Sequence, residues 1–181
     1  MKTLKILAGS ILLACATLSF VPLDEWIMVR TANCKIFFPE EPIDQSRTVN
    51  TDKGDLKVNI YLYKASPNTK DENIAYILTE TEYPDSVMSS DKTDKLEEFF
   101  KNSIDGVVNN FHSKLLSQST TEINGFPGRE VKLDLQNGKA IMNIRFYLVK
   151  NRMYMLETIT NADKDANKSI EKFMNSFEIT N

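Results

Sequence analysis

Cysteine is scarce in this sequence, whose 181 residues include only Cys15 and Cys34. Cys15 lies in an apolar N-terminal segment with the features of a leader, so the rest of the chain carries a single thiol. A small secreted domain held together by internal disulfides is therefore excluded. A chain of roughly 150 residues buries about two thirds of its unfolded surface, which is enough for a core without cross-links.

Histidine is scarcer still, because His112 is the only one. With no second histidine, and with Cys34 far away in the sequence, a zinc site of cysteine and histidine ligands is not expected. Residues 163–167 begin like a calcium-binding EF-hand loop, but Lys168 and Met174 occupy the places of its required glycine and glutamate. We therefore expect neither a metal ion nor another cofactor.

The sequence also lacks an excess of positive charge. Lysine and arginine number 22 against 25 acidic residues, which gives a net charge of −3. Nucleic-acid binding normally requires a strongly basic face, whereas mild acidity suits a soluble domain. We therefore expect no nucleic-acid partner.

One long apolar stretch is present, and it lies at the N-terminus. Lys2 and Lys5 precede an almost continuous apolar run over residues 6–16. This order of charge and apolar residues is typical of a secretory signal. The sequence predicts a leader over residues 1–23 and one exported domain over residues 24–181.

Three fates of this leader stay open. Leu12-Leu13-Ala14-Cys15 resembles a bacterial lipobox, in which Cys15 would be lipidated and would anchor the new N-terminus to a membrane. Ala14-Cys15-Ala16 also fits an A-x-A site, whose cleavage would free a soluble periplasmic or secreted domain. Finally, residues 6–23 are just long enough to remain as an uncleaved anchor, although Pro22 weakens this reading. All three place the domain outside the cytoplasm.

Strand patterns dominate the first half of the exported part. Residues 25–38 predict two short strands, and residues 74–83 predict another. Between them, residues 47–50 and 56–63 flank a hairpin turn. The second arm of this hairpin is half-buried, with one apolar face that consists of Leu56, Val58, Ile60 and Leu62.

The hydrophobic period then changes. Apolar residues recur at steps of three and four from Leu96 to Leu115, which predicts a helix of five to six turns. His112 falls inside this helix, beside its apolar stripe. Because the stripe carries bulky aromatic residues, the helix should lie flat on a sheet.

Strand signals return in the last third of the chain. Residues 125–128 predict a turn, and residues 130–135, 140–149 and 153–160 predict a three-stranded meander that includes an Asn-Gly hairpin turn. Asp163 is the predicted cap of a final helix, whose expected buried stripe consists of Ala166, Ile170, Phe173 and Phe177. This order predicts an α+β fold. A mostly antiparallel sheet would carry a long mid-chain helix and a C-terminal helix, either on opposite faces as an α/β/α sandwich or together on one face.

This layout resembles the PsbP/Mog1-like family over residues 26–179. The shared features are Phe37-Phe38-Pro39 followed by Pro42, the mid-chain helix, residues 123–128 leading into Glu130, residues 145–147 with 154–156, and the closing segment 173–177. The family includes photosystem accessory subunits, a Ran-binding nuclear protein and bacterial exported domains. The resemblance implies the fold, and binding rather than catalysis. It carries no set of site residues over to this chain.

The sequence offers little for catalysis. Ser89-x-x-Lys92 matches a motif of penicillin-binding enzymes, but the partner motifs of that class and a G-x-S-x-G nucleophile elbow are missing. Glu80 and Glu82 share one strand face and are interpreted as a solvated pair. We predict that the protein is not an enzyme. A hydrolase that uses Ser89 or the two carboxylates is kept as a second alternative.

The candidate contact surface lies in the meander, where basic and aromatic side chains gather: Arg129, Arg145, Tyr147, Arg152 and Tyr154. The favoured function is non-enzymatic binding of an unidentified protein or envelope component, with a membrane reached only through the leader or its lipid. The first alternative is a carrier of an apolar small molecule or lipid between the long helix and the sheet. A sizeable apolar cavity would support the carrier, and a closed core would reject it.

Overall fold

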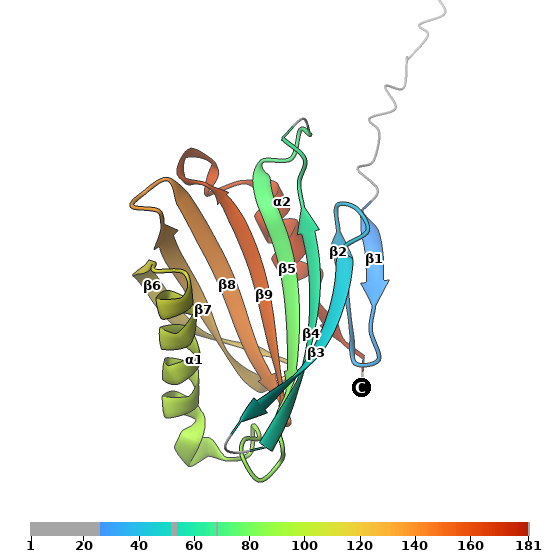
Figure 1. Ribbon diagram of the computed structural model, residues 1–181, viewed down its shortest axis with the longest axis vertical. Coiled ribbons are helices and arrows are strands. Elements are labelled where there is room, and N and C mark those ends of the chain that lie inside the picture. Colours follow the sequence, from blue (N-terminus) through green and yellow to red (C-terminus); the bar gives the residue numbers. More distant parts are fainter. Residues whose placement is uncertain (1–25, 52–53, 68, 181) are drawn as a thin grey trace, which may run out of the picture.

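The computed structural model describes residues 26–51, 54–67 and 69–180. The predicted leader, and with it Cys15, lies outside these residues. The described residues form two antiparallel sheets and two α-helices (Figure 1).

The larger sheet has the strand order β3-β4-β5-β9-β8-β7-β6. Its strands are β3 (Ile43–Thr51), β4 (Gly54–Lys64), β5 (Asn73–Glu82), β6 (Lys114–Ile123), β7 (Phe126–Leu135), β8 (Ala140–Val149) and β9 (Arg152–Asn161). The smaller sheet has the order β1-β2-β10, with β1 (Ile27–Arg30), β2 (Cys34–Phe38) and β10 (Glu178–Ile179). Sequential strands joined by tight turns give the antiparallel sheet that the sequence predicted.

The two α-helices lie on opposite faces of the larger sheet. Figure 1 shows α1 (Leu96–Asn110) in front of the sheet and α2 (Lys168–Asn175) behind it. Short 3-10 turns, Thr93–Lys95 and Ala162–Lys164, precede the two helices. The prediction of an α+β fold is confirmed, with the helices in the α/β/α arrangement. We call the face that carries α1 the front face, and the face that carries α2 the back face.

The front core lies between α1 and strands β7 and β8. Phe100, Ile104 and Val107 point from the helix toward the sheet and are buried against residues such as Leu133 and Phe146. Fully burying a side chain of this size stabilises the fold by roughly 1.5–3 kcal/mol. Acidic residues in the first turn of α1 suit the positive end of the helix dipole.

The back core joins α2 to both sheets. The Phe173 ring lies 5.2 Å from that of Phe38 on β2 and 5.3 Å from that of Tyr76 on β5, centroid to centroid, in edge-to-face geometry. Such aromatic pairs contribute about 0.5–1.5 kcal/mol beyond the area they bury. The back core therefore fixes the small sheet and α2 on the larger sheet.

The predicted long helix is too long. α1 ends at Asn110, and the backbone of His112 has a φ of 49°, in the left-handed region that closes a helix. The amides of Phe111 and Ser113 bond back to carbonyls of the last turn. Leu115 keeps the helical spacing in the sequence but belongs to β6, an exposed edge strand that the pattern did not predict.

Two predicted boundaries in the last third are also wrong. The turn lies at Asn124-Gly125, which have φ values of 51° and 81°, and Gly128 lies inside β7. Asp163 belongs to a 3-10 turn, and the cap of α2 is Asn167, whose side chain accepts a hydrogen bond from the Ile170 amide at 3.0 Å. Ala166 precedes the helix and is exposed, because the chain has not yet turned toward the sheet.

Candidate binding face

The structure does not bring the five predicted contact residues onto one surface. In the antiparallel register Arg129 lies opposite Phe146, so it belongs to the front face, whereas Arg145, Tyr147, Arg152 and Tyr154 point to the back face. Register partners lie on the same face of a sheet. The role of these residues in binding stays a prediction.

The two tyrosines of this set are core residues. Tyr147 is 5% exposed and Tyr154 is 1% exposed. The Tyr147 ring stacks on Phe177 at 5.9 Å, and the Tyr154 ring lies 5.1 Å from the same phenylalanine. Burial raises the pKa of Tyr154 above its usual range. Neither ring reaches a partner without opening the back core.

The three arginines are each engaged within the chain. Arg129 pairs with Glu97 and lies over the Phe100 ring, 4.7 Å from its centroid. Arg145 donates to Glu130 at 2.6 Å and to the Asn175 side chain at 2.7 Å. These contacts neutralise the basic patch that the sequence suggested.

Arg145 also lines a small hollow between α2 and strands β6 to β8, with a volume of about 200 Å³. Its other charged members are Glu130 and Lys132, and Lys132 pairs with Asp165 at 2.7 Å. Charge in this hollow is therefore balanced by pairs internal to the chain.

The carboxylates considered for catalysis form a structural cluster. Glu80 is 1% exposed, so its interpretation as a solvated side chain is wrong. Its Oε1 accepts a hydrogen bond from the Thr31 hydroxyl at 2.8 Å and from the Cys34 thiol at 3.1 Å. Arg152 lies 3.9 Å from its Oε2 and donates to Glu82 at 3.1 Å. The cluster ties the small sheet to β5 and β9, and only Glu82 of the two carboxylates is partly exposed.

The serine motif is likewise a turn rather than a nucleophile with its base. Lys92 donates through Nζ to the carbonyls of Asp85 and Ser86, at 2.5 and 2.9 Å. Its amide also bonds to the Ser89 carbonyl at 3.1 Å. The lysine therefore holds the loop before α1, and a hydrolase that uses Ser89 finds no support in this geometry.

The space between α1 and the sheet is filled by its own side chains. Hollows of about 550 and 470 Å³ flank α1 on its outer sides, and charged residues such as Lys95, Glu98 and Lys101 line them. Phe100 beneath the helix is 1% exposed. The core directly under α1 is tightly packed at this position, which does not favour a carrier with its cavity there.

A different surface stands out on the front face, where one row of register partners crosses six strands. From the β3 edge toward the opposite edge, the row consists of Ile43, Leu62, Ile77, Glu157, Ile144 and Val131. Ile144 and Val131 lie in the core under α1 and are 2% and 4% exposed. Toward the other end, Leu62 and Ile77 are half-buried and Ile43 is 62% exposed. The helix therefore covers only one half of the row.

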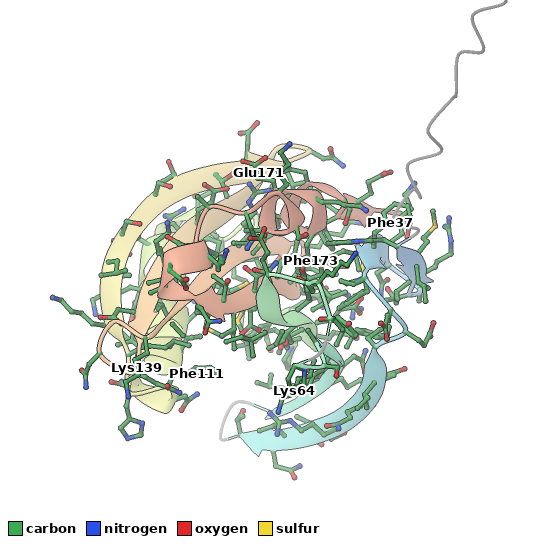
Figure 2. All side chains as sticks on the ribbon, turned by 90° about the horizontal axis from the view of Figure 1, so that it is seen from above. Phe37, Lys64, Phe111, Lys139, Glu171 and Phe173 are labelled. Carbon is green, nitrogen blue, oxygen red and sulfur yellow. The ribbon has the colours of Figure 1, made fainter. Side chains whose placement is uncertain are left out.

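Half-exposed apolar side chains surround the uncovered half. We define the open face as Ile43, Ile60, Leu62, Ile77, Met155 and Ile159, which come from strands β3, β4, β5 and β9. Seen from above, α1 and the β3–β4 hairpin lie on one side of the central strands and α2 lies on the other (Figure 2). The open face thus begins beside the helix and extends onto the edge hairpin.

The C-terminal part of α1 carries a glycine on the flank that faces away from β6. Ile104, Lys101 and Asp105 line the hollow on the β6 side, which places Gly106 on the opposite flank. A Cβ atom added at Gly106 would meet no atom within 4 Å. The space beside this part of the helix is therefore free.

Glu157 lies on β9, at the position where the part of the sheet that α1 covers ends. Its side chain is 3% exposed and belongs to the same face as Met155 and Ile159. Its Oε1 accepts a long hydrogen bond from the Thr79 hydroxyl, at 3.5 Å. Burial raises the pKa of Glu157 from 4.5 to about 8, and the Thr79 hydroxyl lowers it only partly. The group is therefore a neutral carboxylic acid in the folded protein near pH 7.

Sequence reasoning missed this residue, although a signal was present. Met153, Met155, Glu157 and Ile159 alternate along one strand face, so an acid interrupts an otherwise apolar series. An acid at such a position is either solvated or buried, and the alternation alone does not distinguish the two. Its register partners on the two neighbouring strands, Ile144 and Ile77, are apolar, and this apolar setting accounts for the burial of Glu157.

Within residues 26–51, 54–67 and 69–180, no helix is long and apolar enough to cross a membrane. The same residues contain no cluster of three or more histidine, cysteine, aspartate or glutamate side chains suited to a metal ion.

Comparison with known proteins agrees with the fold. No family model and no curated protein matches the sequence. The solution structure of cyanobacterial PsbP (CyanoP) from Synechocystis sp. PCC 6803 matches the chain with a TM-score of 0.54. The match covers 92% of this chain and 99% of that one, at 11% sequence identity. At this identity the likeness concerns the fold alone, and the chain has a PsbP-like fold.

Proposed function

We propose that this chain is a non-enzymatic exported domain that binds a protein partner through the open face. The observation that carries the proposal is the half-covered row on the front face, whose apolar residues pass from the core under α1 to an exposed edge. A contiguous apolar surface that the described residues leave uncovered is typical of a binding site.

A protein partner is favoured over a carried small molecule. The open face is a surface on four strands, whereas a carrier requires an enclosed apolar cavity, and the space under α1 is filled. A surface of this kind suits an apolar stretch of another chain. The internal pairing of the carboxylates and of Lys92 supports a function without catalysis.

Export is proposed from the leader. Intact mass and detergent partitioning of the natively expressed protein would decide its fate, with Cys15→Ala as the control. An acylated chain that begins at Cys15, and that the substitution abolishes, would establish a membrane-anchored lipoprotein. An unmodified chain that begins after Ala16 would establish a free periplasmic or secreted domain and exclude the anchor.

The binding proposal can be tested with two neighbouring positions on β3. Ile43 belongs to the open face, and Asp44, also exposed, points to the back face. A photo-reactive amino acid at position 43 should cross-link a specific protein in the native cell, and the same group at position 44 should not. The identified partner, once purified, should bind the Ile43→Asn variant about tenfold or more weakly, since an apolar side chain of this size contributes roughly 1.5–3 kcal/mol when buried. Its affinity for Asp44→Asn should be unchanged.

Other outcomes would overturn the proposal. Equal cross-linking from both positions would remove the open face as the binding surface. A cross-link between two copies of the chain would make it a self-association surface, and a co-purifying lipid held at position 43 would revive the carrier.

A further inference from the structure

We infer that the partner segment bound at the open face presents a cationic side chain, a lysine or an arginine flanked by apolar residues, which pairs with Glu157. The inference rests on the proposed function and specifies the chemistry of the partner. It adds a binding role for a residue that contributes to no ion pair of its own.

Geometry singles out Glu157. Apolar residues precede and follow it on its face of β9, and its register partners Ile77 and Ile144 are apolar too. Of the ion pairs formed by the described residues, none includes Glu157. One long contact with Thr79 leaves most of its hydrogen-bonding capacity unused. A buried carboxyl that is this poorly satisfied is costly, and a cation from outside would satisfy it.

Among the described residues, the cations nearest to this face lie on other strands or are already paired. On the front face, β4 contributes Lys64 and β3 contributes Arg47, both exposed and separated from β9 by one or two intervening strands. Strand β7 contributes Arg129, which Glu97 and the Phe100 ring already hold. On α1, Ser103 and Gly106 have no charge, and Lys95 just before the helix is exposed and lines a hollow together with Glu98. The partner must therefore supply the cation.

Glu157 lies at the border of the open face, and because its side chain is only 3% exposed it must move to meet a bound group. It stands at the last covered position of the row, next to half-exposed Ile77, and the flank of the helix at Gly106 leaves free space. A bound segment would complete the cover that α1 begins. Its apolar residues would contact Leu62 and Ile77, and its cation would reach the carboxyl group at their border.

Pairing with a cation requires the carboxylate. The pKa of Glu157 is raised to about 8 by burial, so near pH 7 each binding event releases one proton from Glu157 to the solvent. Affinity for the cationic partner should therefore increase as the pH rises from about 6 to 8 and level off above it. A partner with a neutral group at this position would show no such dependence.

A pair of small probes tests the inference without a known partner. N-octylguanidinium carries an apolar chain with a cation, and N-octylurea is its neutral analogue. Binding is measured on the full exported domain by chemical-shift changes of backbone amides, at several pH values. We expect both probes to shift amides of the open face, with N-octylguanidinium binding more tightly at pH 8.5 than at pH 6.

The Glu157→Gln variant completes the test, with Glu130→Gln on the back face as the matched control. Glu157→Gln should weaken N-octylguanidinium about tenfold or more at pH 8.5 and abolish the pH dependence, because a charged hydrogen bond is worth more than a tenfold change in affinity. It should leave N-octylurea unchanged, and Glu130→Gln should change neither probe. If both probes bind the open face equally and Glu157→Gln affects neither, the cation inference is overturned while the binding face stands. If neither probe shifts the open face, both proposals fail.

Discussion

Two glycines offer a matched test of the packing on and around the larger sheet. Gly106 lies inside α1, and a Cβ atom there would meet nothing within 4 Å. Gly128 lies in β7, where a Cβ atom would be 2.5 Å from the Phe146 carbonyl oxygen and 2.7 Å from a ring carbon of Tyr147. The same substitution, glycine to alanine, should therefore have opposite effects at the two positions.

Gly106→Ala should stabilise the protein by about 0.5–1 kcal/mol, because alanine loses less conformational entropy than glycine in a helix and nothing obstructs the added methyl group. Gly128→Ala should destabilise it by about 2 kcal/mol or more. The obstructing oxygen belongs to the backbone of the paired strand, so β7 and β8 would have to separate locally.

Equilibrium unfolding in urea, followed by circular dichroism and by the fluorescence of Trp26, measures both changes. For a domain of this size, each kcal/mol should also move the melting temperature by roughly 2–4 °C. A destabilised Gly106→Ala variant would show that the flank of α1 is packed and would remove the free space beside Glu157. A Gly128→Ala variant of unchanged stability would contradict the close approach of the two strands.

Three further predictions concern buried polar groups. Asn167→Ala should cost about 1–3 kcal/mol in the free energy of unfolding, since it removes both the cap of α2 and buried hydrogen bonds of the Asn167 amide. Burial raises the pKa of the Cys34 thiol, so iodoacetamide at pH 8 should label it only as fast as the protein unfolds; labelling at the rate of a free thiol would show that the back core opens. Glu157 has a folded pKa of about 8, above its unfolded value of 4.5, so its contribution to stability is fully present below pH 4.5 and is lost as the pH rises to about 8. Glu157→Gln should therefore gain stability relative to the wild type over this range, by up to about 1.4 kcal/mol per pH unit in urea titrations, and a constant difference would contradict the raised pKa.

The periodicity of the sequence was sufficient to predict most strands and the face that each residue takes. Leu56, Val58, Ile60 and Leu62 do share one face of β4, and β8 has the predicted bounds. Alternation does not say what covers that face. Val58 is buried, whereas Ile60 and Leu62 are half-exposed, because α1 lies over the other half of the sheet. The open face could not be predicted from the strand pattern, because it depends on where α1 lies over the sheet.

The errors have local physical causes. Phe111 and Leu115 continue the helical spacing past the true end of α1, and neither glycine nor proline marks the stop. His112 closes the helix in a conformation that glycine or asparagine more commonly adopts. Strand β6 is an edge strand rich in serine and threonine, so it lacks the apolar alternation by which strands are recognised.

The predicted contact residues were grouped by their closeness in the sequence. The register separates them, because Arg129 and Arg145 lie on different faces although both belong to the meander. Basic side chains on a sheet also find acidic partners that sequence spacing does not reveal, as Arg145 does with Glu130. Single-sequence reasoning could name the residue types of a contact surface, but only the pairing of strands decides which of them meet.

Glu157 shows how a structural and a functional role of one residue can be separated. If the carboxyl group served only the fold, replacing it by an uncharged amide would change stability and nothing else. As a binding residue it should give effects of opposite sign, so that Glu157→Gln is more stable at pH 8 and yet binds a cationic ligand more weakly. A buried acid that reduces stability above its unfolded pKa, and that borders a surface its own helix leaves open, is therefore a position at which the two roles can be told apart.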